Sequence, residues 1–298
     1  MDSIISEQKA GNFLGTAHIY QASLNAFGAF TGSKNILFRQ MTPALLKRFE
    51  HYLRLRGNSW NTVSTYMRML QAVYNRAVVR KLAAFIPHQF RDVFTGRKAD
   101  HRRVLERDDM QKLLVERDPD ITSPGMAWAR ACLELMFRFH GMPFVDLAHL
   151  RKSDLKDGYL TLRRRKTGMP LSARVDGRAM QLLERYRNRD DTSPYLLCFL
   201  DGNLEGMAAY RDYQRILRLL NSRLRVLALW KKVQGKVTSY SARHTWATVG
   251  RYCHIPIEVI SEGLGHASVT TTEGYMKGFG NSRMDRANKV IMNYIFKG

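Results

Sequence analysis

The 298-residue sequence has few cysteines, few acidic residues and no long apolar run. Its three cysteines, Cys132, Cys198 and Cys253, are far apart and lie in apolar stretches. This excludes a disulfide-rich scaffold and a cysteine zinc site, and it predicts buried thiols in a reducing compartment. No run of 18 or more apolar residues occurs, and residues 1–9 lack the charged and apolar parts of a signal peptide. We therefore expect a soluble protein in the cytoplasm.

Acidic residues are outnumbered: 48 Lys and Arg stand against 26 Asp and Glu, which gives a net charge of +22 and a pI of about 10.2. Such an excess is self-repelling unless a polyanion neutralises it, so nucleic acid is the favoured partner. A membrane surface is a weaker alternative, because no predicted helix combines a wide apolar face with a basic one. The carboxylates are dispersed, which argues against a two-metal nuclease, and we expect neither a metal nor another cofactor.

The first part of the chain predicts a small helical domain. We expect a loose arm over residues 1–15, a helical domain over 16–91 and a polar, basic linker over 92–104. Apolar residues recur at helical spacing from Thr16, again after the N-cap and first-turn proline Thr42-Pro43, and again from Trp60. The third helix carries Arg68 and Arg76 on its polar face. Such a face is as typical of an ordinary solvated bundle as of a DNA-binding one.

The second part, residues 105–298, predicts a mainly helical domain with a small antiparallel sheet. Helices are expected from Arg107, over 124–139 and over 210–230, and a short amphipathic helix over 284–296. Alternation over 159–163, a Lys-Thr-Gly turn and a return strand over 169–175 predict a β-hairpin. A further strand is expected over 195–200.

The most informative stretch is 237–279. It contains Arg-His-Thr-Trp-Ala-Thr from Arg243, then Leu-Gly-His ending at His266, then Tyr275 nine residues later. Each residue alone is more often a surface charge or a packed side chain. Together they closely resemble the second signature box of the tyrosine recombinases, the phage integrase family. The resemblance covers most of residues 105–298 and, more loosely, 10–90.

The resemblance implies an N-terminal SAM-like, core-binding domain that clamps DNA and a mixed α/β catalytic domain. It also implies a cytoplasmic protein associated with the bacterial nucleoid. It makes Arg243 the second catalytic arginine and Tyr275 the nucleophile. His266 stands at the position in the second signature box that is His or Trp in the family. The resemblance further implies a 3′-phosphotyrosyl intermediate formed without metal or ATP, a monomer that becomes a homo-tetramer on two double-stranded DNA sites, and a C-terminal helix that docks in a neighbouring protomer.

The first signature box departs from the family pattern. The family pattern in this box is Gly-Leu-Arg-x-x-Glu. In this chain Pro143 stands at the position of the arginine, and Asp146 stands at the position of the acid. A branch from mobile elements of gut bacteria has an arginine directly before the glycine, where this chain has His140. The first arginine is therefore absent, replaced by His140 or supplied from elsewhere, for example by Arg151. A histidine with a purely structural role at a helix end is an equally good interpretation of His140.

The remaining catalytic residues follow from the resemblance as well. The family's catalytic lysine lies on the β-hairpin, which makes Lys166 the expected acid for the departing 5′ oxygen. A histidine three residues before the second arginine is replaced by Tyr240; because a phenol is a poor base near neutral pH, Tyr240 is expected to hydrogen-bond the phosphate. The residues expected to contact DNA are all basic: Arg68, Arg76, Arg97, Lys98, Arg102, Arg103, Arg163, Arg164 and Arg165.

These observations predict a site-specific DNA recombinase of the integrase or invertase type. The alternative is a DNA-binding protein of the same fold that is impaired in cleavage, because the first arginine is missing from its usual position.

Overall fold

The computed structural model describes all residues except 34, 99–103, 115–122, 267, 274–287 and 289–298. The chain forms two compact units, Met1–Ala99 with Leu204–Arg211, and Asp100–Asn203 with Asp212–Gly298. None of the helices in the described part of the chain has the length and apolar character needed to cross a membrane.

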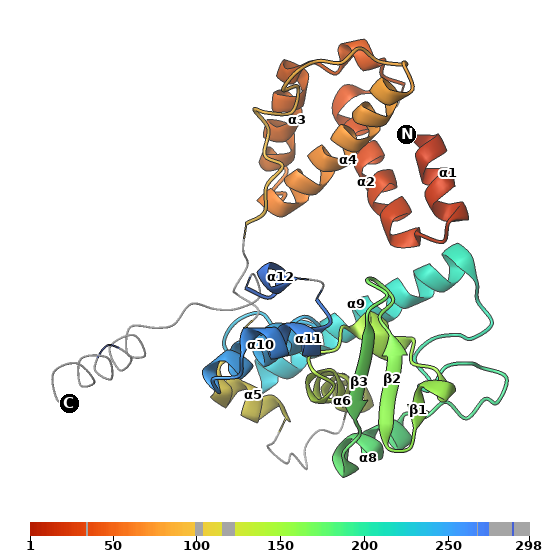
Figure 1. Cartoon of the computed structure of the whole chain (residues 1–298), viewed down its shortest axis with the longest axis vertical. Helices are drawn as coiled ribbons and strands as arrows, with labels where there is room; N and C mark the ends of the chain where they lie inside the picture. Colours follow the sequence, from red (N-terminus) through yellow and green to blue (C-terminus); the bar gives the residue numbers. More distant parts are fainter. Residues whose placement is uncertain (34, 99–103, 115–122, 267, 274–287, 289–298) are drawn as a thin grey trace. The chain divides into compact units, whose positions relative to one another are not determined.

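The first unit is helical (Figure 1). Its elements are α1 (Asp2–Ala10), α2 (Leu14–Thr31), the 3-10 helix η1 (Phe38–Gln40), α3 (Pro43–Leu55) and α4 (Trp60–Val79). Side-chain caps start α3 and α4, since Thr42 accepts a hydrogen bond from the Leu45 backbone N–H and Ser59 accepts one from that of Thr62, both at 3.2 Å. The sequence therefore marks the two helix starts by their caps.

The expectation of a loose arm over residues 1–15 is wrong. Asp2–Ala10 forms α1, and both Ile4 and Ile5 are buried in a cluster with residues of α2 and α4. Arg76 of α4 also contacts this helix through a two-point ion pair with Glu7, at 3.1 and 3.2 Å. A single turn of apolar residues gave too little periodicity to reveal the helix, because packing rather than propensity stabilises so short an element.

Part of the expected linker is fastened to the first unit. The buried carboxylate of Glu50 accepts a hydrogen bond from the Phe94 backbone N–H at 2.6 Å. Asn61 makes two hydrogen bonds to the backbone of Lys98, each at 2.8 Å. The ammonium of Lys98 also lies 5.0 Å from the centre of the Trp60 ring. The chain is thus held to α3 and α4 as far as Lys98.

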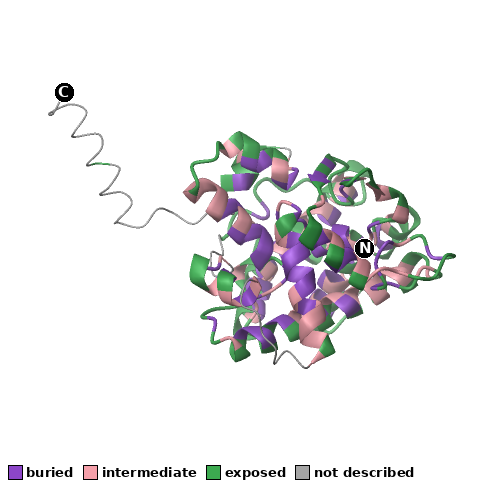
Figure 2. Cartoon of the chain, turned by 90° about the horizontal axis from the view of Figure 1, so that it is seen from below, coloured by how far each residue is buried: buried purple, intermediate pink, exposed green. Residues whose placement is uncertain are grey.

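The second unit is built around α6 (Pro124–Arg138), which packs against helices on several sides. Its other helices are α5 (Arg107–Leu114), α7 (Phe144–Ala148), the 3-10 helix η3 (Lys152–Asp154), α8 (Gly177–Arg185), α9 (Gly206–Trp230), α10 (Ser241–Tyr252), α11 (Ile257–Leu264) and α12 (Val269–Glu273). Of α9, only the part from Asp212 onward belongs to this unit. Helix α6 contacts α5, α7, α8 and α10. Buried residues line the inner faces of the helices and exposed residues cover the outer faces (Figure 2).

The sheet of the second unit has three antiparallel strands in the order β1 (Leu155–Lys156), β2 (Tyr159–Arg163) and β3 (Pro170–Arg174). Leu160 pairs with Ala173 and Leu162 with Leu171, so one face of the hairpin joins the core. The turn closes through the Gly168 N–H, which donates to the Arg164 carbonyl at 2.8 Å. The predicted hairpin and the mainly α fold with a small antiparallel sheet are confirmed.

Two smaller expectations fail. Residues 195–200 form no strand; only single bridges join Tyr195 to Arg151 and Leu197 to Arg187. Cys132 is buried, and burial raises the pKa of its thiol well above the usual value, whereas Cys198 and Cys253 are exposed. An apolar run in the sequence was therefore a poor guide to strand pairing and to thiol burial at these positions.

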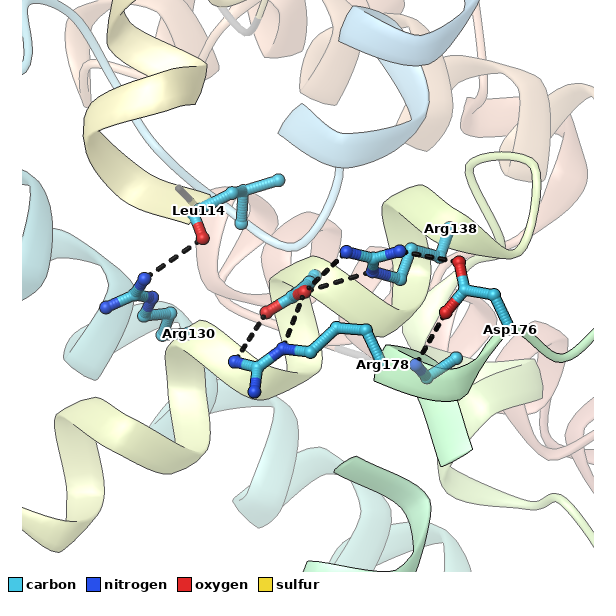
Figure 3. Close-up of polar contacts among 7 residues, drawn as sticks. Leu114, Arg130, Arg138, Asp176 and Arg178 are labelled. Atoms are coloured by element: carbon cyan, nitrogen blue, oxygen red, sulfur yellow. Dashed lines mark hydrogen bonds and ion pairs between the residues drawn. The ribbon is translucent and has the colours of Figure 1, made fainter. Parts of the chain in front are cut away.

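A buried carboxylate joins α6 to α8 (Figure 3). Glu134 accepts hydrogen bonds from Arg138 at 3.0 Å and from Arg178 at 3.2 and 3.4 Å. Arg138 also contacts Asp176 at 2.6 Å, and Asp176 caps α8 through the Ala179 N–H at 2.7 Å. Arg138 is therefore held between two carboxylates.

Candidate active site

The site forms where the start of α10 meets the α6–α7 turn and the end of α11. Ala242 and Thr245 are fully buried, and the Thr245 hydroxyl accepts a hydrogen bond from the Leu105 N–H at 3.0 Å. Arg243 lies between them in the sequence and is itself only 5% exposed. A guanidinium so deeply buried needs several acceptors to offset the loss of water.

Backbone carbonyls and His266 supply these acceptors. Arg243 Nη1 donates to the Gly141 carbonyl at 3.0 Å, and Nη2 donates to the Leu264 carbonyl at 2.6 Å. Nη2 also lies 2.7 Å from His266 Nε2. The structure therefore brings together Arg243 and His266, two of the residues that the sequence predicted to act together.

The contacts of His266 determine which of its ring nitrogens carries the proton. Arginine has no acceptor, so His266 Nε2 must accept from Arg243, and the proton of the neutral ring lies on Nδ1. Nδ1 then donates to the hydroxyl of Thr272, 2.8 Å away and fully buried in α12. Thr272 thus fixes the orientation of the imidazole beside the guanidinium.

Gly141 is required by its backbone conformation and by the close approach of α10. Its φ is +64°, and a Cβ at this position would lie 2.9 Å from the Arg243 Cα. Only glycine allows the Gly141 carbonyl to approach the Arg243 guanidinium in this conformation.

Asp146 and Arg164 form a second buried charged pair in the site. Both side chains are almost inaccessible, at 3% and 4% exposure, and Asp146 Oδ2 lies 3.8 Å from Arg164 Nη1. Asp146 Oδ1 accepts a hydrogen bond from the Arg165 N–H at 3.0 Å. Burial raises the pKa of Asp146, while the Arg165 N–H and the charges of Arg164, Arg243 and Arg165 act in the opposite direction. The carboxylate therefore fixes the hairpin turn against α7.

Arg164, one of the residues predicted to contact DNA, has its side chain buried within the second unit. Its guanidinium points inward, and Nη2 donates to the Gly263 carbonyl at 3.4 Å. Arg163 and Arg165, its neighbours in the sequence, are exposed. A residue leaving a strand can point to either face of the hairpin, and the sequence alone could not assign that face.

His140 lies at the end of α6 with φ +55° and its ring centre 5.6 Å from that of Trp246. Burial, and to a smaller extent the charge of Arg164, lower the pKa of His140 below its ordinary value. Its imidazole is therefore neutral near pH 7 and differs from an arginine in charge.

The other sequence-predicted residues occupy varied positions. Lys166 is exposed in the hairpin turn, and Tyr240 precedes α10 with 42% exposure and its ring centre 6.2 Å from that of His244. Of the predicted DNA contacts, Arg68, Arg97 and Lys98 are exposed, and Arg76 is engaged with Glu7. Tyr275, Arg102, Arg103 and the helix expected over 284–296 lie outside the described residues.

The sequence analysis missed Thr272 and did not foresee the inward direction of Arg164. Thr272 belongs to the run of threonines after Leu-Gly-His, and its spacing of six from His266 was the available signal. The inward direction of Arg164 had no signal beyond its place in a run of three arginines. Among the described residues, no group of three or more His, Cys, Asp or Glu side chains could hold a metal ion.

The protein thus has a helical N-terminal unit and a C-terminal unit that contains the candidate active site. The model of the phage integrase SAM-like domain matches residues 1–91, and the model of the phage integrase family matches residues 103–279. The chain therefore belongs to the phage integrase family.

Relatives support the same family at lower similarity. The tyrosine recombinase XerA of Pyrococcus furiosus is 29% identical over 140 residues, which is 46% of each chain. The putative integrase/recombinase y4gC of Sinorhizobium fredii is 27% identical over 180 residues, 58% of this chain and 88% of the relative. The alignment with XerA thus spans about half of that protein.

Among solved structures, a lambda integrase dimer bound to a COC′ core site has the same fold. It superposes with a TM-score of 0.66 at 16% identity and covers 94% of this chain and 96% of the other. The prediction that the chain resembles the tyrosine recombinases is confirmed.

Proposed function

We propose that the protein is a site-specific DNA recombinase of the integrase or invertase type. The observation that carries the proposal is the buried cluster of Arg243 and His266, held together by two backbone carbonyls and Thr272. We infer that the positive charge of Arg243, with His266 beside it, stabilises the negative charge that a phosphodiester gathers during substitution at phosphorus. Membership of the phage integrase family supports the same function.

The proposed reaction uses Tyr275, which lies within the range matched by the family model. The phenolic oxygen forms a bond to the scissile phosphorus as the bond to the 5′ oxygen breaks. The phenol gives its proton to solvent water, and the departing 5′ oxygen receives one from the ammonium of Lys166. The product is a 3′-phosphotyrosyl link, which keeps the energy of the phosphodiester and allows resealing to a new partner strand without ATP.

The catalytic residues in this proposal are Tyr275, Arg243, His266 and Lys166. Tyr240 is exposed at the start of α10, a position suited to a hydrogen bond with the phosphate. The partner is double-stranded DNA at specific sites, and recombination requires a homo-tetramer on two sites. The N-terminal unit and the segment through Lys98 serve as the DNA clamp.

The test is covalent capture. A library of genomic DNA fragments carrying nicks 3′ of candidate sites is incubated with the protein, denatured and separated, so that only covalently linked DNA is recovered. We expect adducts with the wild-type chain and none with Tyr275→Phe, which retains DNA binding. DNA that is bound by the wild-type chain but never linked would instead support the cleavage-impaired DNA-binding protein. Plasmid relaxation without sequence preference would indicate topoisomerase activity.

A further inference from the structure

The first signature box lacks an arginine, and nearby residues do not replace it well. Arg138 is held between Glu134 and Asp176 on the side of α6 that meets α8. Arg151 is exposed. His140 is neutral near pH 7 and packs on Trp246. In a cleaving enzyme, a second positive charge for the phosphate would therefore come from elsewhere in the fold.

Arg164 lies at the appropriate place in the structure. It starts the hairpin turn, yet its side chain is directed into the second unit, 3.8 Å from Asp146 Oδ2. Asp146 occupies the acidic position of the same signature box. The charge of Arg164, after burial, also lowers the pKa of His140, the residue that precedes Gly141.

The two buried arginines are held by neighbouring peptide groups. Arg164 Nη2 donates to the Gly263 carbonyl and Arg243 Nη2 donates to the Leu264 carbonyl, at 3.4 and 2.6 Å. Their guanidiniums therefore approach the same short segment, which ends in His266. Arg243 is just as buried as Arg164, at 5% against 4% exposure, so burial in the absence of DNA does not distinguish the two.

Gly265 provides the space for this approach. With φ +62°, it ends α11, and a Cβ there would lie 2.5 Å from Arg164 Nε. A side chain at position 265 would thus displace the Arg164 guanidinium. The glycine of the Leu-Gly-His sequence, which also terminates the helix in a left-handed conformation, leaves room for an arginine that comes from the hairpin.

We propose that Arg164 is a catalytic residue that supplies the second guanidinium to the nonbridging oxygens of the scissile phosphate, beside Arg243, with Asp146 orienting it. This assignment rests on the proposed function, because it concerns the same reaction. An arginine that arrives from a different place in the sequence compensates for Pro143 at the usual position. The carboxylate of Asp146 keeps the guanidinium fixed before the substrate enters, which reduces the reorganisation that the reaction requires.

The experiment compares phosphate with a neutral analogue. The nicked fragment captured by the wild-type chain is prepared with an ordinary scissile phosphate and with a methylphosphonate, which lacks the negative charge. Cleavage is measured in single turnover at saturating protein for the wild-type chain, Arg164→Ala, Arg164→Lys and the control Arg174→Ala, an exposed arginine at the end of β3. DNA affinity and melting temperature are measured in parallel.

We expect Arg164→Ala to slow cleavage of the phosphate by about 100- to 1,000-fold while DNA affinity changes by less than about threefold. On the methylphosphonate, the same variant should differ from wild type by less than about tenfold, because no charge needs neutralising. Arg164→Lys retains the charge without the planar fork and should show an intermediate loss with the same dependence on substrate. If Arg164→Ala does not fold, Arg164→Lys carries the comparison.

The outcomes separate the two proposals. If the Arg164 variants cleave as fast as the wild-type chain, the assignment of Arg164 alone is overturned. The same holds if they are slowed by the same factor on the phosphate and on the methylphosphonate, because that pattern indicates a structural role. A loss of equal size in Arg174→Ala overturns the assignment as well. A wild-type chain that forms no covalent adduct overturns the proposed function, and the assignment of Arg164 with it.

Discussion

At the scale of single residues, His149 gives a pH dependence with a definite sign. Its ring lies 5.7 Å from that of Tyr195 and 5.4 Å from that of Tyr213, and its Nδ1 is 2.7 Å from the Val145 carbonyl. Burial, followed by the charge of Arg165, lowers the pKa of His149 to about 4. Below about pH 6.5 the unfolded chain binds a proton that the folded imidazole accepts only near pH 4. The free energy of unfolding therefore falls as the pH drops from about 6.5 toward 4.

We expect His149→Phe to remove this contribution. Between pH 7.5 and 5.0 the wild-type chain should lose about 2 kcal/mol more stability than the variant, as measured by urea unfolding. Wild type and variant are compared at each pH, so that other titrating groups cancel. The exposed His51 provides a matched control, and His51→Gln should follow the wild-type pH profile. Parallel profiles for wild type and His149→Phe would contradict the assignment.

At the scale of secondary-structure elements, the contact between the α6–α7 turn and α10 depends on Gly141. Gly141 and Gly158 both have positive φ, +64° and +75°, but only at Gly141 would an added Cβ lie within 3 Å of the backbone of another element. Gly158→Ala should cost about 1 kcal/mol for the left-handed conformation. Gly141→Ala should cost at least about 2 kcal/mol more, because α10 must also move away.

The comparison is made by urea unfolding, together with covalent capture of nicked DNA. Gly141→Ala moves the carbonyl that holds Arg243, so its cleavage rate should fall while that of Gly158→Ala remains near wild type. Equal destabilisation by the two substitutions would show that α10 does not restrict the space at position 141.

At the scale of the whole molecule, the net charge of +22 predicts DNA binding that depends steeply on salt. Each phosphate neutralised by a basic side chain releases condensed counterions and contributes about −0.9 to the slope of log affinity against log salt. We expect a slope of magnitude about 5 or more, measured by titration of a duplex between about 50 and 200 mM salt. Substitution of an exposed basic residue such as Arg68 should reduce it by about 1 if that residue contacts a phosphate. A slope near zero would contradict a mainly electrostatic interface.

The sequence by itself determined the local elements and the second signature box. Thr42-Pro43 marked the start of α3, the alternation of Leu160 and Leu162 marked β2, and the spacing of Arg243 and His266 marked the site. These features were predictable because caps, strand alternation and box spacing depend on residues close together in the chain. Residues 1–15 and 195–200 were predicted wrongly, because burial against distant elements decided their structure.

Only the tertiary structure decided how the site is completed. The hydrogen bond from His266 to Thr272, the carbonyl of Gly141 at Arg243 and the inward direction of Arg164 join segments from four parts of the chain. In the sequence, Arg163, Arg164 and Arg165 are three equivalent charges. They become different because the pairing of β2 with β3 and the position of Asp146 bury one guanidinium and leave its two neighbours exposed. Direction and burial of a side chain are properties of packing between elements, which residue type and spacing alone do not encode.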